Sequence, residues 1–372
     1  MKTLPLVLAA LVSSTAAALT PAEFQQLYTT RDKTAEVCHQ LYQAYLKGDG
    51  VEADKSQARK WLLAAHGSGM HSLREKIYSQ PWRKKAKLKA SIKAARVSDE
   101  EAYSLGQELV QFMLDHGGRE RLGMDMLPEE KPSRELVAGV KDFIAKGADL
   151  NACVTEQGST ATALYLACKM GDSALMDLLI NHGADPNYHG GLALQAFYFF
   201  ATSDSINKYV MKSRKNQEKK ARKLFAQLVK KGADVRMWSH VGWSPVYAAV
   251  HANSPLGVQM LVKAGADPDQ KQNINEVANH TLSAQRISYL TLGFGVDKEE
   301  TPLNTAAIYA RSEVAAALLK AGATPDLPNA KGETPAQLAR ELKEALEAKP
   351  AAERNPIMEQ HTQTILKLLK AS

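Results

Sequence analysis

The sequence predicts an all-α protein built as a helical repeat solenoid, and three observations lead to this expectation. Helix-favouring Ala, Leu, Lys and Glu recur throughout, while aromatic residues make up 6% of the chain. A Gly-Ala-Asp triplet returns with a base period near 33 residues. Apolar residues at helical spacing precede its copies. With 372 residues, 45% of them hydrophobic, the chain is long enough for two or three compact domains.

The first 18 residues have the features of a signal peptide. Lys2 precedes an apolar stretch (residues 4–12), and Ala16 and Ala18 supply the small residues of a cleavage site. This stretch is too short to span a membrane, and no other stretch is long enough. The alternative is an apolar first helix of the domain. We expect a signal peptide over 1–18, a mature chain with no transmembrane anchor, and a periplasmic or secreted location.

Residues 19–97 are expected to form a helical region, and part of it resembles the SEL-like repeat, a relative of the tetratricopeptide repeat. The positions that match this family are Tyr45, Gly48, Gly50, Val51, Asp54, Ala58, Trp61, Ala64, Ala65 and Gly67. The resemblance implies a tight turn at the two glycines, a second helix opened by Asp54, and a helix pair packed by Trp61. One such unit cannot bury its own apolar face, so we expect it to pack on neighbouring helices.

Residues 98–132 are predicted to hold a capping helix and a linker. Ser98 and Glu101 have the spacing of a capping box, and an apolar face follows. Gly117 and Gly118 are expected to close this helix. It is predicted to serve as the first inner helix, or the N-terminal cap, of the repeats that follow.

Residues 133–372 contain the repeats themselves. A glycine can end a helix by adopting the left-handed conformation, and Thr-Pro pairs at Thr301 and Thr334 mark helix starts by capping and by proline at the first helical position. The copies of the triplet, the last of them Gly-Ala-Thr, begin at Gly147, Gly183, Gly232, Gly265 and Gly322. Their uneven spacing predicts two insertions, near residues 202–218 and 271–300.

These signals together resemble the ankyrin repeat family, whose signature is Thr-Pro-Leu-His-x-Ala followed by a second helix and Gly-Ala-Asp. The best copies begin at Thr162, Ser244 and Thr301. The usual histidine is replaced in them by Tyr165, Tyr247 and Asn304. The resemblance implies a stack of helix pairs with hairpin fingers, and a binding surface on its concave side.

The resemblance also implies which residues of this chain bind a partner. The hairpin tips correspond to Tyr188, His189, Trp238, His240 and Trp243, and the inner helices contribute Lys169, Met170, His251, Ile308 and Tyr309. Trp, Tyr and Met bring large contact areas to interfaces. Trp243 and Tyr309 could equally pack between repeats. Trp238 and Tyr188 are the stronger candidates, because a hairpin tip leaves little room for burial.

Positive charge is concentrated in two segments. The chain carries a formal charge of +7, and basic residues gather in Arg83–Arg96 and in Lys208–Lys231. Basic amphipathic helices can attach to anionic surfaces. No aromatic stacking platform accompanies the first segment, so the sequence does not favour nucleic-acid binding.

No familiar catalytic or metal-binding pattern occurs in the sequence, so we expect a protein that is not an enzyme and has no catalytic residues, metal site or cofactor. Three cysteines are too few for a disulfide scaffold. Cys153 and Cys168 could pair, but the ankyrin register places Cys168 at a small buried position, which favours free thiols.

The sequence therefore predicts an exported protein-protein interaction module that binds a protein partner on the ankyrin concave face. Its role could be that of an inhibitor or immunity-type protein, an assembly factor or a secreted effector. One alternative is a structural protein of the envelope or membrane surface that attaches through its basic helices. Another is an enzyme with an unrecognised site.

Overall fold

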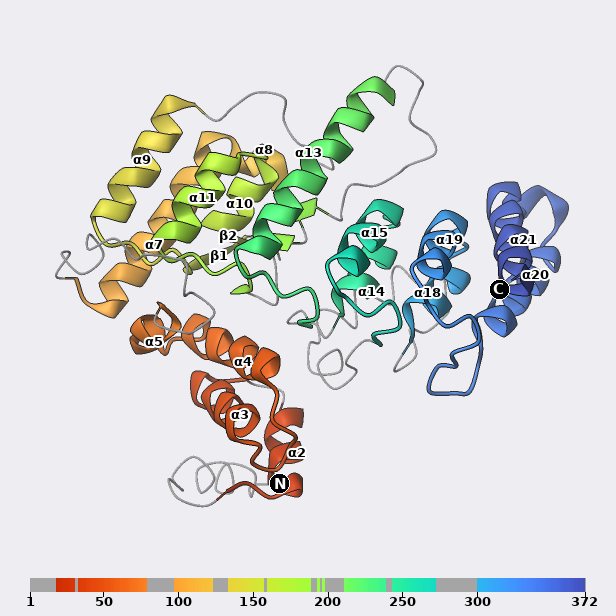
Figure 1. Ribbon diagram of the computed structural model, residues 1–372, viewed down its shortest axis with the longest axis horizontal. Coiled ribbons are helices and arrows are strands. Elements are labelled where there is room, and N and C mark those ends of the chain that lie inside the picture. The colour runs from red at the N-terminus through yellow and green to blue at the C-terminus, as the bar shows by residue number, and fades with distance from the viewer. Residues whose placement is uncertain are drawn as a thin grey trace.

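The computed structural model describes most of the chain, namely residues 18–30, 33–78, 97–122, 133–156, 159–188, 193–194, 196–197, 211–238, 243–271 and 300–371. The predicted all-α repeat fold is confirmed, since helices paired along the chain form a row of repeats (Figure 1). The expected signal segment over residues 1–17, the basic segment Arg83–Arg96 and nearly all of the second insertion lie outside the described residues.

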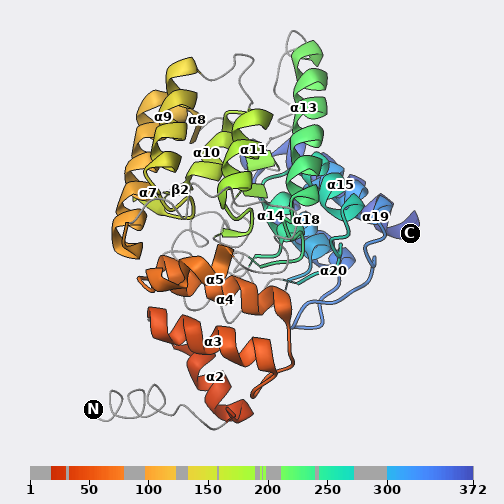
Figure 2. The same ribbon diagram turned by 60° about the vertical axis from the view of Figure 1, so that its left-hand side comes forward.

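The N-terminal unit lies against one edge of the repeat stack (Figures 1 and 2). Gly48, at a φ of 85°, ends the second helix of the unit, and Asp54 caps the third by accepting hydrogen bonds from the backbone of Ser56 and Gln57. The tight turn and the helix pair expected here are therefore present. The elements of the unit are α2 (Pro21–Thr29), α3 (Ala35–Lys47), α4 (Lys55–Gly67), η1 (His71–Leu73) and α5 (Arg74–Tyr78).

The predicted capping helix begins where expected. Ser98 Oγ accepts a hydrogen bond from Glu101 N at 3.2 Å, and the helix packs against the outer helix of the first repeat. Its residues Leu109, Val110 and Met113 belong to the same hydrophobic core as the repeats. The elements of this region are α7 (Asp99–Met113), the π-helical turn η3 (Leu114–Gly118), α8 (Arg119–Leu122) and α9 (Arg134–Ala145).

The repeats continue as pairs of helices with extended turns between them. The first turn contains a two-stranded antiparallel hairpin in which Cys153 pairs with Thr162. Prolines at the first helical position follow capping hydroxyls at Ser244, Thr301 and Thr334, as the sequence predicts for the last two. The elements are β1 (Cys153–Glu156), β2 (Ser159–Thr162), α10 (Ala163–Lys169), α11 (Ser173–His182), α13 (Met211–Lys230), α14 (Pro245–His251), α15 (Pro255–Lys263), α18 (Pro302–Ile308) and α19 (Ser312–Lys320).

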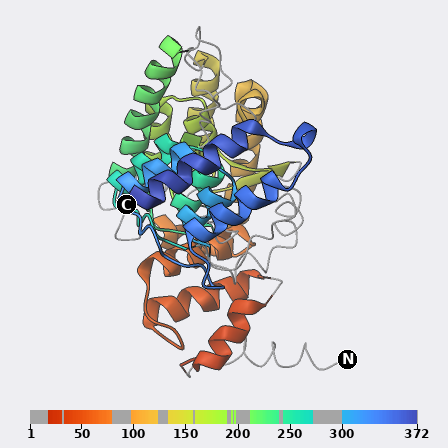
Figure 3. The same ribbon diagram turned by 90° about the vertical axis from the view of Figure 1, so that its right-hand side faces the viewer.

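Two longer helices close the far end of the stack. Viewed from this end, α20 (Pro335–Glu347) and α21 (Pro356–Ala371) lie in front of the other repeats (Figure 3), with η5 (Ala351–Glu353) between them in sequence. Positive φ angles are found at the five triplet glycines that the sequence marks as helix ends: Gly147, Gly183, Gly232, Gly265 and Gly322. The first predicted insertion overlaps the start of α13, while residues 202–210 lie outside the described part.

Two large hydrophobic cores hold the described structure together, and a small third cluster joins Ala310, Leu342 and Leu346. One runs through the whole stack, from Leu109 in α7 to Ile365 in α21. The other lies in the N-terminal unit around Leu41, Trp61 and Leu62, and it includes Tyr188 from the repeats. Burying a side chain of this size contributes about 1.5–3 kcal/mol. The N-terminal unit is therefore fixed to the stack by shared packing.

Candidate functional site

A row of aspartates and asparagines connects the turns of successive repeats. Asn151 donates to Gly183 O at 3.1 Å and accepts from Asp185 N at 2.7 Å. One repeat further on, Asn187 donates to Gly232 O at 2.9 Å and accepts from Asp234 N at 2.6 Å. These bonds satisfy backbone groups that the end of each outer helix leaves open. The row fixes the backbone of the turns that carry Asp149, Asp185 and Asp234.

Helix α4 lies along this row and meets three of the carboxylates. Ser56 Oγ donates to Asp234 Oδ2 at 2.7 Å, Arg59 Nη2 lies 2.9 Å from Asp185 Oδ1, and His66 Nε2 lies 2.8 Å from Asp149 Oδ2. Arg59 Nη1 also donates to Gly232 O at 3.3 Å. Each contact pairs a polar group of α4 with a different repeat. The N-terminal unit therefore covers the turns of the repeats that carry these three aspartates.

This docking overturns the expected exposure of Tyr188. The side chain is only 3% exposed, because it enters the core of the N-terminal unit and its hydroxyl lies 3.4 Å from His66 Nδ1. Burial raises the pKa of Tyr188 well above its usual range. Its neighbour His189 lies outside the described residues, as does His240. A hairpin tip has little room to bury a side chain within its own stack, but here the N-terminal unit buries Tyr188.

Lys169 and Met170 are also buried, which contradicts their expected place on a binding surface. They are 7% and 5% exposed, because the end of α10 packs within the stack, where Met170 joins the common core. The adjacent Cys168 is a buried thiol that forms no disulfide, so it does not pair with Cys153. Desolvation raises the pKa of the Cys168 thiol well above its usual range.

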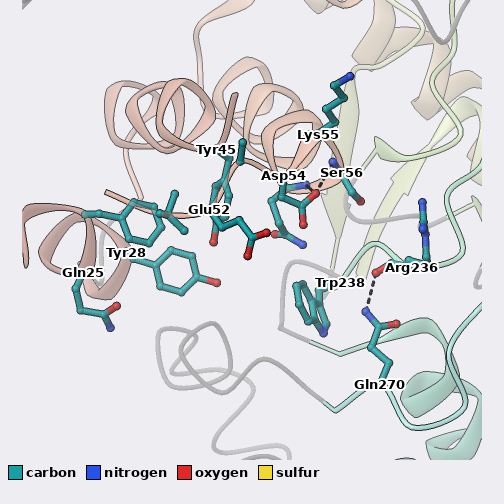
Figure 4. A pocket seen from close by; sticks show the side chains of 14 residues that line it. Gln25, Tyr28, Tyr45, Glu52, Asp54, Lys55, Ser56, Arg236, Trp238 and Gln270 are labelled. Carbon is teal, nitrogen blue, oxygen red and sulfur yellow. Dashed lines mark hydrogen bonds between the residues drawn. The ribbon is translucent and has the colours of Figure 1, made fainter. Parts of the chain in front are cut away.

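Trp238 lies in a cleft at the end of the docked interface (Figure 4). The cleft has a volume of about 820 Å³, and α2, α3, the start of α4 and two repeat turns line it. Trp238 Nε1 donates to Lys271 O at 3.0 Å, and Gln270 Nε2 donates to Arg236 O at 2.8 Å. Both bonds tie neighbouring turns together. The volume falls within the range of about 300–1,000 Å³ found for ligand sites.

The remaining predicted residues lie along the inner helices. Trp243, His251 and Tyr309 are half-buried and form a continuous aromatic row, with ring centroids 4.6 Å apart for the first pair and 6.2 Å for the second. Ile308 is half-buried beside Tyr309. Packing between repeats is therefore present for both Trp243 and Tyr309, while part of each side chain stays accessible.

Arg311 adds a positive charge to this row. Its guanidinium lies 5.0 Å from the ring centroid of Tyr309, and its Nη1 donates to Val250 O. Desolvation, reinforced by the Arg311 charge, lowers the pKa of His251 to about 4. His251 is therefore neutral near pH 7, and the row presents aromatic faces and a single guanidinium.

Sequence reasoning missed several residues of the cleft, among them Tyr28, Glu52, Arg236 and Gln270. They come from two regions separated by nearly two hundred positions, and no motif joins them. The polar residues Arg59 and His66 in α4 indicate contacts of this helix with other parts of the chain, but they meet the repeat turns and do not line the cleft. In the described part of the chain, no group of three or more His, Cys, Asp or Glu residues is placed to hold a metal ion. No helix there is long and apolar enough to cross a membrane.

The comparison with protein families identifies two of the helix pairs. The ankyrin repeat family model matches residues 161–190 and 241–273, which contain the α10–α11 and α14–α15 pairs. The chain is also similar to a solved ankyrin repeat domain from Acinetobacter baumannii AYE, with 18% identity, 64% of this chain and 92% of that chain covered, and a TM-score of 0.38. No curated protein matches. Two segments of the chain thus match the ankyrin repeat model within a mostly helical repeat fold.

Proposed function

We propose that this protein is an exported interaction module that binds a protein partner on the part of the ankyrin surface left open by its own N-terminal unit. Ankyrin repeats generally mediate protein-protein interaction. The observation that carries the proposal is the placement of α4 over Asp149, Asp185 and Asp234. Partner contacts are thereby directed to the cleft at Trp238 and to the aromatic row at Tyr309.

Affinity capture with paired variants tests this surface. The full chain is used as bait in an extract of its native compartment, and the bound protein is identified by mass spectrometry. Trp238→Ala combined with Tyr309→Ala is expected to reduce capture of that protein by about tenfold or more, because truncating large aromatic anchors costs the most binding energy. Ile357→Ala, at a position 64% exposed on α21, serves as the control. Equal capture by all three proteins would contradict the proposal.

Export is a separate part of the proposal and rests on the first 18 residues. The periplasmic or secreted location follows from the order of charge, apolar stretch and small residues. N-terminal sequencing of the protein isolated from its source is expected to begin at Leu19. A native chain that still begins at Met1 would contradict export. It would not affect the proposed binding surface. The same surface would serve an inhibitor or immunity-type protein, an assembly factor or a secreted effector.

Helix α13 favours a second candidate, attachment to an anionic envelope or membrane surface. Lys219, Arg222, Lys223 and Lys230 are exposed on it, while its apolar side packs in the stack through residues such as Leu224. Co-sedimentation with anionic vesicles distinguishes the two candidates, because surface-charge attachment weakens steeply with ionic strength. Binding at low salt that vanishes at high salt would support this candidate.

A further inference from the structure

The cleft beside Trp238 has a distinct chemical character. Aromatic rings of the N-terminal unit line one wall, with Phe24 stacked 5.5 Å from Tyr28 and edge-on at 5.3 Å to Tyr45, measured between ring centroids. Trp238 lies across from them on the repeat side (Figure 4). The Trp238 N–H is already bonded to Lys271 O, so what the indole offers a ligand is its ring.

The charged side chains that line the cleft point in different directions. Glu52 is exposed and points into the space between Tyr28 and Trp238, whereas Lys55 and Arg236 project away from it (Figure 4). The Asp54 carboxylate is engaged in capping α4. The free negative charge of Glu52 therefore dominates the middle of the cleft.

Two amide oxygens add to the acceptors there. Gln57 is 3% exposed and lines the cleft, yet its Oε1 accepts no hydrogen bond from any residue that the structure describes. The same holds for Gln270 Oε1, although its amide nitrogen is bonded to Arg236 O. Buried acceptors of this kind are ordinarily paired. Both oxygens have almost no accessible surface, so a ligand with several N–H donors would satisfy them once the two amides turn towards the cleft.

We propose that the cleft binds an arginine or lysine side chain carried by an extended segment of the protein partner. The cation lies against the face of Trp238, which attracts it through its ring quadrupole, beside the aromatic wall that contains Tyr28. Glu52 forms a charge-assisted hydrogen bond with it, and Gln57 and Gln270 accept from its remaining donors. The inference rests on the proposed function, because it specifies the chemistry of the partner at that surface.

Other occupants fit these groups less well. A phosphate or carboxylate would face the Glu52 charge. A wholly apolar segment would leave the buried acceptors of Gln57 and Gln270 without a donor, and an unpaired buried acceptor costs free energy. A basic side chain meets both requirements, since its aliphatic stem covers ring surface while its end supplies donors.

Peptide binding to the purified full chain tests the proposal. The probes are immobilised nine-residue peptides of mixed sequence whose central residue is fixed as Arg, Lys, citrulline or Glu. Citrulline keeps the shape of arginine and lacks its charge. The strongest Arg peptide is then measured by fluorescence anisotropy against Glu52→Gln, Trp238→Ala and a matched control, Glu341→Gln, which alters an exposed carboxylate on α20.

The expected result is stronger binding of Arg and Lys peptides than of citrulline or Glu peptides. Glu52→Gln should weaken the Arg peptide about tenfold, as loss of a charge-assisted bond does, while Glu341→Gln binds unchanged. Equal binding of Arg and citrulline peptides, or no effect of Glu52→Gln, would overturn the proposal. Because Glu52 is on the surface, its variant should fold normally.

The result also separates this inference from the proposed function. If peptides bind without a charge preference and Trp238→Ala abolishes their binding, the proposed interaction surface stands. The proposal that the cleft selects a cationic side chain is then rejected. An Arg preference that depends on Glu52, together with undiminished capture of the natural partner by the Trp238→Ala/Tyr309→Ala double variant, would support the cleft chemistry and reject the proposed partner surface.

Discussion

Arg59 and Asp185 show at the scale of single residues how the N-terminal unit is held. Their side chains are 8% and 0% exposed and lie 2.9 Å apart, with 126 positions between them in the sequence. Removing the charge of Arg59 would leave the Asp185 carboxylate buried without its main counter-charge. We expect Arg59→Met to lower the free energy of unfolding by about 3–5 kcal/mol, measured by urea denaturation.

An exposed ion pair provides the matched comparison. Lys146 and Asp142 lie 2.7 Å apart at the C-terminal end of α9, with both side chains more than half exposed. Lys146→Met is expected to change the stability by about 0–1 kcal/mol, because solvent screens such pairs. Similar effects of the two variants would show that α4 is not docked as described.

His251 makes a second prediction, for the pH dependence of stability. Its pKa in the folded protein is about 4, lowered by burial and then by Arg311, against an ordinary value of 6.5. Between these values the unfolded chain binds a proton that the folded chain does not, so stability falls as the pH drops from about 6.5 to about 4. The half-buried site reduces the effect to about 1–2 kcal/mol.

Replacing this histidine by phenylalanine isolates its contribution. His251→Phe keeps a ring between Trp243 and Tyr309 and removes the titrating group. Urea denaturation at pH 6.5 and pH 4.5 is expected to show a smaller loss of stability in the variant than in the natural protein. An equal loss of stability in the variant and the natural protein would show that a group other than His251 titrates.

At the scale of elements, α7 depends on a close approach at Gly106. A Cβ atom built at this position would lie 2.1 Å from Asp149 O and 2.6 Å from Ala152 Cβ, closer than atoms can pack. Alanine ordinarily improves a helix by about 1 kcal/mol over glycine. Here the backbone of the first turn would have to move, and we expect Gly106→Ala to destabilise by about 1–3 kcal/mol.

Ser104→Ala is the control for this helix, since Ser104 is exposed on α7. It should leave the melting temperature unchanged or raise it slightly, because alanine favours the helix and meets no neighbour. Thermal unfolding of both variants gives the comparison. A Gly106→Ala protein as stable as the natural one would contradict the close packing of α7 on the Asp149 turn.

Most element boundaries could be predicted from the sequence, because they depend on local chemistry. Ser98, Thr301 and Thr334 cap helices as their spacing indicates, and the triplet glycines adopt the positive φ angles that end helices. These signals act within a few residues. These signals, together with the period of the Gly-Ala-Asp triplet, predict the repeat fold.

The arrangement of the candidate site could be predicted only in part. Trp238 does line a cleft, but the burial of Tyr188 depends on a unit 122 positions away in the sequence at His66. Repeat registers describe contacts between neighbouring repeats. They contain no information on which turns a preceding unit covers, so the sequence alone places Tyr188 on an open surface.

At the scale of the whole molecule, the N-terminal unit and the stack form one surface. The hydrophobic core of the unit contains Tyr188, and its helix α4 reaches three successive turns. The cleft is closed on one side by α2 and α3 and on the other by repeat turns (Figure 4). A partner that binds the cleft therefore contacts both parts at once.

Cross-linking across the docked interface tests this account most directly. Ser56 Oγ and Asp234 Oδ2 lie 2.7 Å apart, so Ser56→Cys and Asp234→Cys place two thiols within reach of a short bis-thiosulfonate reagent. Peptide mass spectrometry of the treated full chain should show one intramolecular link between these positions, absent from a protein with only its natural cysteines. Thiols capped separately, or linked only between molecules, would contradict the docked arrangement.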